Sequence, residues 1–204
     1  HLLSLAYIKD NTGINCLSMS IILSECLLAS GIYARVVYMM PKAADDGDNH
    51  VVAEAFIAEW NKWIMLDPTY GSYCCDSSGE VLNLYEIRKR IINNEEYFFS
   101  DKLNYNGETV SDLADLKEYY AKNLFFLRSK ARQGYGMHRE YGDMVEMAPI
   151  NFDVHERMLL NLQYRIHEYG ECDLFTDWMS YESQLDNRYV DIESFYEPPC
   201  DREN

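Results

Sequence analysis

The segment from Cys16 to Ser30 constrains the fold more than any other part of the sequence. Leucine, isoleucine and cysteine recur at helical spacing on almost every side of it. This pattern predicts a helix that is apolar nearly all round and is therefore buried. Asn15 is a suitable N-cap, and Gly31 is a suitable residue for ending the helix.

Three predicted strands follow that helix. Residues 33–40 are rich in β-branched and aromatic side chains, and an acidic loop over 42–49 separates them from a second strand over 50–58. Asn61 and Lys62 mark a hairpin turn, after which residues 63–66 form the returning strand. Residues 11–70 thus predict a helix followed by antiparallel strands.

The remaining two thirds of the chain extend this α+β pattern. Helices are predicted over 82–93, 112–122 and 154–169, and short strands over 124–127, 144–148 and 189–196. On the helix over 112–122, Leu113, Leu116 and Tyr120 share the apolar face. We expect one domain over residues 1–204, with a core over 11–70 and a mixed helix and strand extension over 71–204. The chain opens on His1 within an apolar stretch, so we expect further residues upstream.

Composition excludes some classes of partner. The 204 residues are 48% apolar and 14% aromatic, which is typical of a packed globular chain and not of a disordered one. The formal net charge of −16 argues against nucleic acid and against an anionic membrane surface. No stretch approaches the roughly 20 apolar residues that span a bilayer. No pattern in the sequence fixes an oligomeric state.

The sequence predicts no metal or cofactor site. None of the six cysteines forms a C-x-x-C pair, so zinc spacing is absent, and we expect mostly free thiols. Free thiols favour a reducing compartment such as the cytoplasm. The histidines at 138, 155 and 167 lack metal-ligand spacing, and the acidic loop over 45–48 lacks the twelve-residue calcium pattern.

Three residues carry the chemistry that this order of elements suggests. Cys16 stands in the first turn of its helix, where free amide groups and the helix dipole favour a thiolate and can hold an oxyanion. His50 opens a strand directly after the acidic loop, and Asp67 ends the paired strand of the same hairpin. Pairing of the two strands can bring Asp67 to the far nitrogen of the imidazole, where it fixes the tautomer.

Each of these residues also has an ordinary structural explanation. A cysteine in a helix is usually a small buried apolar residue, a histidine at a strand edge is often a surface residue, and an aspartate before Pro68 is common in turns. The order of the three residues along a helix, a strand and the next strand end is more informative than any one of them. It predicts a Cys-His-Asp acyl-transfer site.

Four blocks of sequence resemble the transglutaminase-like superfamily. They are Gly13-Ile14-Asn15-Cys16, Ala29-Ser30-Gly31-Ile32-Tyr33-Ala34-Arg35-Val36-Val37, His50-Val51-Val52-Ala53-Glu54 and Trp63-Ile64-Met65-Leu66-Asp67-Pro68-Thr69. The family pattern has a cysteine at a helix start, Gly-Ile-x-Ala-Arg, His-x-Trp-x-Glu and Trp-x-x-x-Asp-Pro-Thr. The resemblance covers residues 11–70, about a third of the chain. It implies a papain-like α+β core in which Cys16, His50 and Asp67 form the catalytic triad.

The sequence departs from the family pattern in two places. Val52 stands where the family often has tryptophan, which affects the shape of the pocket. No side-chain oxyanion donor is evident, because Asn11 and Asn15 are the only amides near Cys16 and Asn15 is better explained as a helix cap. Glu54 lies on the His50 side of its strand, and a surface or structural role suits it better than a catalytic one.

The resemblance implies thiol-dependent acyl transfer on a peptide or protein amide. Hydrolysis, as in a cysteine peptidase or amidase, is the expected reaction. Transamidation of the transglutaminase kind is one alternative, and a non-catalytic binding module on the same scaffold is another. The complete set of three residues argues against the binding module.

Overall fold

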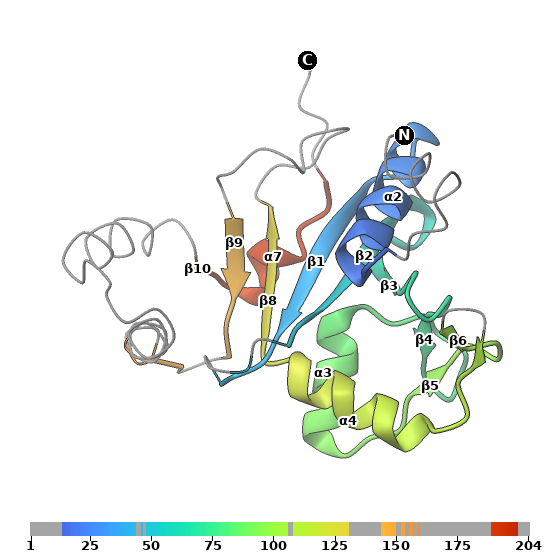
Figure 1. Cartoon of the computed structure of the whole chain (residues 1–204). Helices are drawn as coiled ribbons and strands as arrows, with labels where there is room; N and C mark the ends of the chain where they lie inside the picture. The colour runs from blue at the N-terminus through green and yellow to red at the C-terminus, as the bar shows by residue number, and fades with distance from the viewer. Residues whose placement is uncertain are drawn as a thin grey trace.

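The computed structural model describes residues 14–43, 46, 48–105, 108–130, 144–149, 152–153, 156, 159 and 189–199. Its frame is a sheet in the order β10-β9-β8-β1-β2-β3 (Figure 1), and β10 alone is parallel to its neighbour. The strands are β1 (Ala34–Met40), β2 (His50–Ile57), β3 (Lys62–Leu66), β8 (Phe126–Lys130), β9 (Met144–Met147) and β10 (Tyr189–Val190). The chain is therefore mixed α+β with an antiparallel sheet, as expected. Five consecutive strands of this sheet, from β9 to β3, are antiparallel.

Within the described residues, four helices and several short elements accompany this sheet. The helices are α2 (Cys16–Ala29), α3 (Leu84–Asn93), α4 (Leu113–Asn123) and α7 (Ile192–Phe195), with the one-turn 3-10 helix η1 (Ala58–Trp60) between β2 and β3. Two small ladders pair β4 (Cys74–Cys75) with β5 (Phe98–Phe99) and β6 (Asn104–Tyr105) with β7 (Glu108–Thr109). Over the described ranges, no helix is both long and apolar enough to cross a bilayer.

Helix α2 begins and ends as the sequence predicts. The side chain of Asn15 accepts a hydrogen bond from the Ser18 amide at 2.9 Å, and Gly31 follows the helix with φ +80°. The expectation that the apolar side chains of α2 are buried is wrong, because they are only half-buried. The small residues Ser20 and Ser24 face the sheet instead, which lets the helix backbone approach β1 and β2 closely.

The opposite face of the sheet carries the main core. Side chains of β1, β2 and β3 on that face pack against α3, α4 and α7. The buried members include Val37, Met39, Val52, Met65, Leu84, Ile87, Leu116, Tyr120, Leu127 and Phe195. His50 and Glu54 alternate in register with Val52, so both side chains point to this face.

Two of the predicted strands begin or end away from their predicted bounds. The strand expected over 124–127 begins at Phe126, because Leu124 is still the C-cap of α4. The strand expected over 189–196 is wrong beyond Val190, since Asp191 caps the start of α7. On the apolar face expected for α4, Leu116 and Tyr120 are buried, whereas Leu113 at the first turn is 46% exposed. The predicted helix over 154–169 is not described as a whole.

Candidate active site

The strand pair β2 and β3 brings His50 and Asp67 together. His50 opens β2 opposite Met39 and is 2% exposed. Asp67 directly follows β3, where its backbone forms a tight bridge with Ser72 through hydrogen bonds of 2.7 and 2.9 Å. His50 Nε2 and Asp67 Oδ2 are 2.6 Å apart. The histidine and the carboxylate therefore form a buried hydrogen bond at the end of the hairpin.

Helix α2 is held to strand β2 through both backbone groups of Val51. The Ser20 hydroxyl donates to the Val51 carbonyl at 2.9 Å, and the Val51 amide donates to the Cys16 sulfur. Strand β3 pairs with β2 only as far as Ala53, so its hydrogen bonds do not reach Val51. Cys16 and Ser20 lie one helical turn apart on one face of α2. The helix thus takes the place of a neighbouring strand and brings the thiol to His50.

Contact between Cys16 and His50 shifts the pKa of both groups. Burial raises the pKa of the Cys16 thiol, but hydrogen bonds from His50 and from the Val51 and Leu17 amides bring it below its ordinary value. Burial lowers the pKa of His50, but the hydrogen bonds to Asp67 and Cys16 outweigh burial and raise that pKa to about 9. The two shifts together favour a thiolate paired with an imidazolium at neutral pH.

The tautomer of His50 follows from its two partners. Nε2 is engaged by Asp67, which leaves Nδ1 for the hydrogen bond with the thiol. The proton that passes between sulfur and imidazole therefore sits on the Nδ1 side, while Nε2–H stays directed at the carboxylate. This is the division of roles that an acyl-transfer site needs.

The Asp67 carboxylate has donors on both of its oxygens. Oδ1 accepts from the amide of Thr69 at 2.9 Å and from that of Tyr70 at 3.4 Å. Oδ2 accepts from the Tyr120 hydroxyl at 2.5 Å as well as from His50. A buried carboxylate is tolerable only with such a set of partners, and this set fixes its orientation.

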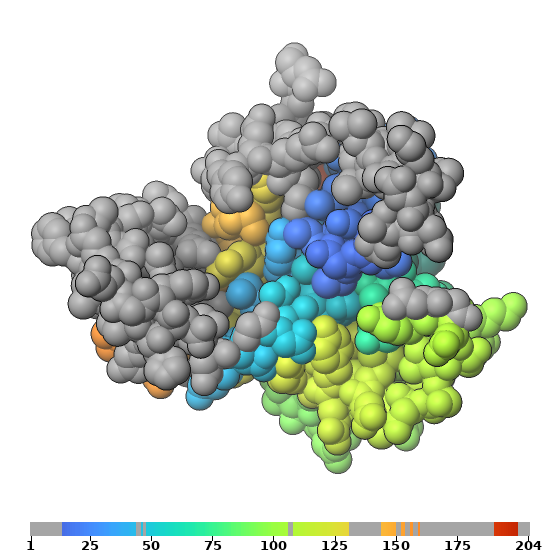
Figure 2. All heavy atoms as spheres, in the orientation of Figure 1, coloured from blue at the N-terminus to red at the C-terminus, as the bar shows by residue number. Residues whose placement is uncertain are grey.

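Three tyrosine rings enclose the imidazole. The ring centroids of Tyr70, Tyr119 and Tyr120 lie 5.8, 5.4 and 5.9 Å from that of His50. Two of these rings come from α4, which lies far from His50 in the sequence. On the face drawn in Figure 2, the yellow-green atoms of α4 and the blue atoms of α2 flank the cyan atoms near the start of β2.

The three residues singled out in the sequence therefore meet in space. Cys16 comes from the start of α2, His50 from the start of β2 and Asp67 from the end of β3. The sequence did not indicate that Tyr119 and Tyr120 would join them. The apolar face predicted for the α4 helix, which includes Tyr120, is the signal that pointed toward burial, but it gave no indication of a hydroxyl bonded to Asp67.

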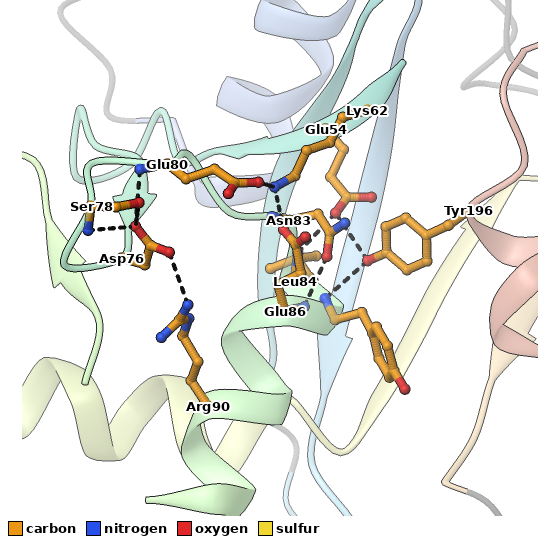
Figure 3. A network of polar contacts seen from close by, with 11 residues as sticks. Glu54, Lys62, Asp76, Ser78, Glu80, Asn83, Leu84, Glu86, Arg90 and Tyr196 are labelled. Atoms are coloured by element: carbon orange, nitrogen blue, oxygen red, sulfur yellow. Dashed lines mark hydrogen bonds and ion pairs between the residues drawn. The ribbon is translucent and has the colours of Figure 1, made fainter. Parts of the chain in front are cut away.

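Glu54 lies in a separate buried network. Its Oε2 accepts from Arg35 Nη2 at 2.7 Å and from Arg35 Nε at 3.1 Å. Its Oε1 accepts from the Leu84 amide and from the Tyr196 hydroxyl, each at 3.1 Å (Figure 3). Arg35 also donates to the Phe195 carbonyl at 2.5 Å. Glu54 is therefore a structural carboxylate that joins β2 to β1, α3 and the C-terminal segment, and the surface position considered for it is wrong.

The other ligand-like residues do not converge. Within the described ranges, no group of three histidine, cysteine or acidic side chains is placed to hold a metal ion. In the acidic loop, Asp46 and Asp48 pair with Lys122 at 3.0 and 2.8 Å. The described cysteines at 16, 26, 74 and 75 are free thiols. The cysteines at 172 and 200 and the histidines at 138, 155 and 167 lie outside the described residues, as does Asn11.

Comparison with known proteins adds no relative. No protein-family model matches the chain, and neither the curated proteins nor the solved structures contain a match.

Proposed function

We propose that this chain is a cysteine-dependent acyl-transfer enzyme that hydrolyses a peptide or amide bond. The observation that carries the proposal is the continuous contact from the Cys16 thiol through the His50 imidazole to the Asp67 carboxylate. Each residue comes from a different element, and each is held by backbone contacts that fix its position. A thiol that takes no part in chemistry does not need contact with a buried imidazole that is itself hydrogen-bonded to an oriented carboxylate.

The fold gives further support. A cysteine at the N-terminus of a helix packed on an antiparallel sheet, with histidine and aspartate on the next two strands, is the arrangement implied by the transglutaminase-like resemblance. We accordingly propose a papain-like core for residues 14–70. The sheet continues beyond this core through β8, β9 and β10.

In the proposed reaction, the Cys16 thiolate attacks the amide carbonyl carbon and forms a carbon–sulfur bond. The His50 imidazolium then gives its Nδ1 proton to the leaving nitrogen, the carbon–nitrogen bond breaks, and a thioester remains on Cys16. Water attacks the thioester while His50 takes its proton, and the departing thiolate restores the ion pair. An amine in place of water would give transamidation through the same thioester.

In this proposal, the first backbone amides of α2 stabilise the oxyanion. An α-helix leaves its first amide groups without intrahelical partners, and their dipoles favour negative charge. Asn15 is occupied with the Ser18 amide, so it is not offered as a donor. We propose the amide of Cys16, one of these first helical amides, as a donor to the oxyanion.

The test is turnover of a peptide and amide library, with mass spectrometry of the products and of the intact protein after acid quench. The proposal predicts products that gain water, a thioester mapped to Cys16, and loss of both in Cys16→Ala. Adding a primary amine separates hydrolysis from transamidation, because only the second incorporates the amine. Turnover that survives in Cys16→Ala, or an acyl group found only on another cysteine, would refute the proposal.

A further inference from the structure

Asp67 Oδ2 is shared between two donors, and only one of them is in the predicted triad. The second is the hydroxyl of Tyr120, which lies 53 residues further along the chain in α4. Tyr120 is 0% exposed and its ring packs against Phe99 at 5.1 Å, so the hydroxyl is held in place by the core. The 2.5 Å contact with Oδ2 is as close as the 2.6 Å contact that His50 makes.

Contacts other than the Tyr120 hydroxyl anchor the Asp67 carboxylate. Oδ1 of Asp67 is held by the amides of Thr69 and Tyr70, and the Asp67 backbone is bridged to Ser72. These contacts do not involve Tyr120, so they would still anchor Oδ1 and the Asp67 backbone if the Tyr120 hydroxyl were removed. Loss of the hydroxyl would change chiefly how much negative charge Oδ2 presents to the imidazole.

We propose that Tyr120 is a positioning residue that, through Asp67, limits how tightly the carboxylate holds the protonated His50 ring. This inference deepens the acyl-transfer function proposed above and rests on it. During acylation the imidazolium donates its proton to the leaving nitrogen. A ring that binds this proton too tightly is therefore a poor acid. Tyr120 would keep the pKa of His50 low enough for the ring to act as that acid.

The direction in which Tyr120 shifts the pKa of His50 follows from its hydrogen bond to the charged Asp67 carboxylate. A donor on a carboxylate stabilises the carboxylate and weakens its attraction for a neighbouring cation. Burial raises the pKa of Tyr120 well above its ordinary value, so the hydroxyl remains a donor throughout the range in which the site would work. Removing it should therefore raise the pKa of His50 above about 9.

Tyr97 offers a matched control. It is 4% exposed in the same core, its ring contacts Phe99 at 5.7 Å, and its buried hydroxyl has no hydrogen-bond partner among the described residues. Tyr97→Phe and Tyr120→Phe thus each remove one buried hydroxyl beside Phe99. Only Tyr120→Phe removes a bond to Asp67.

The experiment is NMR titration of the His50 ring in histidine-labelled full-length protein, with the signal assigned by His50→Gln. A Cys16→Ala background is used as the common parent, so that the ring titrates without a coupled thiol. Tyr120→Phe should raise the pKa of His50 by about half a unit or more, and Tyr97→Phe should leave it unchanged. A His50 pKa that is unchanged or lower in Tyr120→Phe would overturn the inference.

A second variant covers the case in which Tyr120→Phe does not fold. A ring-fluorinated tyrosine at position 120 keeps the hydroxyl and makes it a stronger donor, so it should lower the pKa of His50. No change, or a rise, would overturn the inference in the same way. Because the titration needs no substrate, its outcome is independent of the turnover assay, and failure of acyl transfer remains distinguishable from failure of the role given to Tyr120.

Discussion

Replacing Glu54 by glutamine should destabilise the protein far more than the same change at Glu80. Glu54 is 0% exposed, and its two oxygens accept four hydrogen bonds, two of them from an Arg35 side chain that is 9% exposed. Glutamine keeps the shape of the side chain but loses its charge. Its NH2 group replaces one carboxylate oxygen and cannot accept the hydrogen bonds that this oxygen received. Breaking a buried ion pair in this way costs about 3–5 kcal/mol of unfolding free energy.

Glu80 provides the comparison on the surface of the same region (Figure 3). Its side chain is 63% exposed and pairs with Lys62 at 2.6 Å, a contact of the kind that contributes about 0–1 kcal/mol. The measurement is equilibrium unfolding in urea, followed by tryptophan fluorescence because the Trp63 ring lies 4.3 Å from the Arg35 guanidinium. Equal losses for Glu54→Gln and Glu80→Gln would refute the reasoning about burial.

Three further predictions concern the site and its support. Asp67→Asn should lower the pKa of His50 and slow iodoacetamide alkylation of Cys16 at neutral pH by about tenfold or more, because Asp67 is the larger of the two contributors that outweigh burial of the ring. Ser20→Ala should cost about 1–2 kcal/mol in urea unfolding, since the buried Val51 carbonyl loses its side-chain donor. In Cys16→Ala, the hydrogen bond to Asp67 should still hold the pKa of His50 above its ordinary value of 6.5. This raised pKa should contribute stability that is fully present below about pH 6.5 and is lost as the pH rises through the pKa of the folded state, measured as the difference in unfolding free energy from Cys16→Ala with His50→Gln.

Local signals account for the elements that the sequence predicted well. Asn15 and Gly31 delimit α2, Asn83 forms a capping box at the start of α3, and Asp112 caps α4. These interactions span only a few residues, so a sequence pattern carries them in full. The hairpin from β2 to β3 is local in the same sense, which is why the pairing of His50 with Asp67 followed from the order of the strands.

The contacts that the sequence did not indicate are those between distant segments. Tyr120 bonds Asp67 from 53 residues away, and Tyr196 bonds Glu54 from 142 residues away. Neither hydroxyl belongs to a motif, and each tyrosine looks like an ordinary apolar residue of its element. Arg35 and Glu54 were part of the family resemblance, but their burial depends on α7, which the sequence had suggested to be a strand.

Helix α2 shows why composition alone misjudges burial. Its leucines and isoleucines suggested a helix enclosed on all sides, whereas the buried residues of the helix are Ser20 and Ser24. These small side chains let α2 approach the sheet closely, so that Ser20 and Cys16 reach the Val51 backbone. The catalytic geometry that we propose depends on these small polar residues more than on the apolar ones.

The proposed chemistry requires a Cys16 thiol that is ionised by His50, and site-resolved alkylation measures this ionisation directly. Iodoacetamide labelling is followed by peptide mapping for Cys16 and for the exposed Cys26, at a series of pH values in the wild type and in His50→Ala. At about pH 6 the account predicts that Cys16 reacts at least roughly tenfold faster than Cys26, and that His50→Ala abolishes the difference. Equal rates for the two thiols, or a Cys16 rate that His50→Ala leaves unchanged, would contradict it.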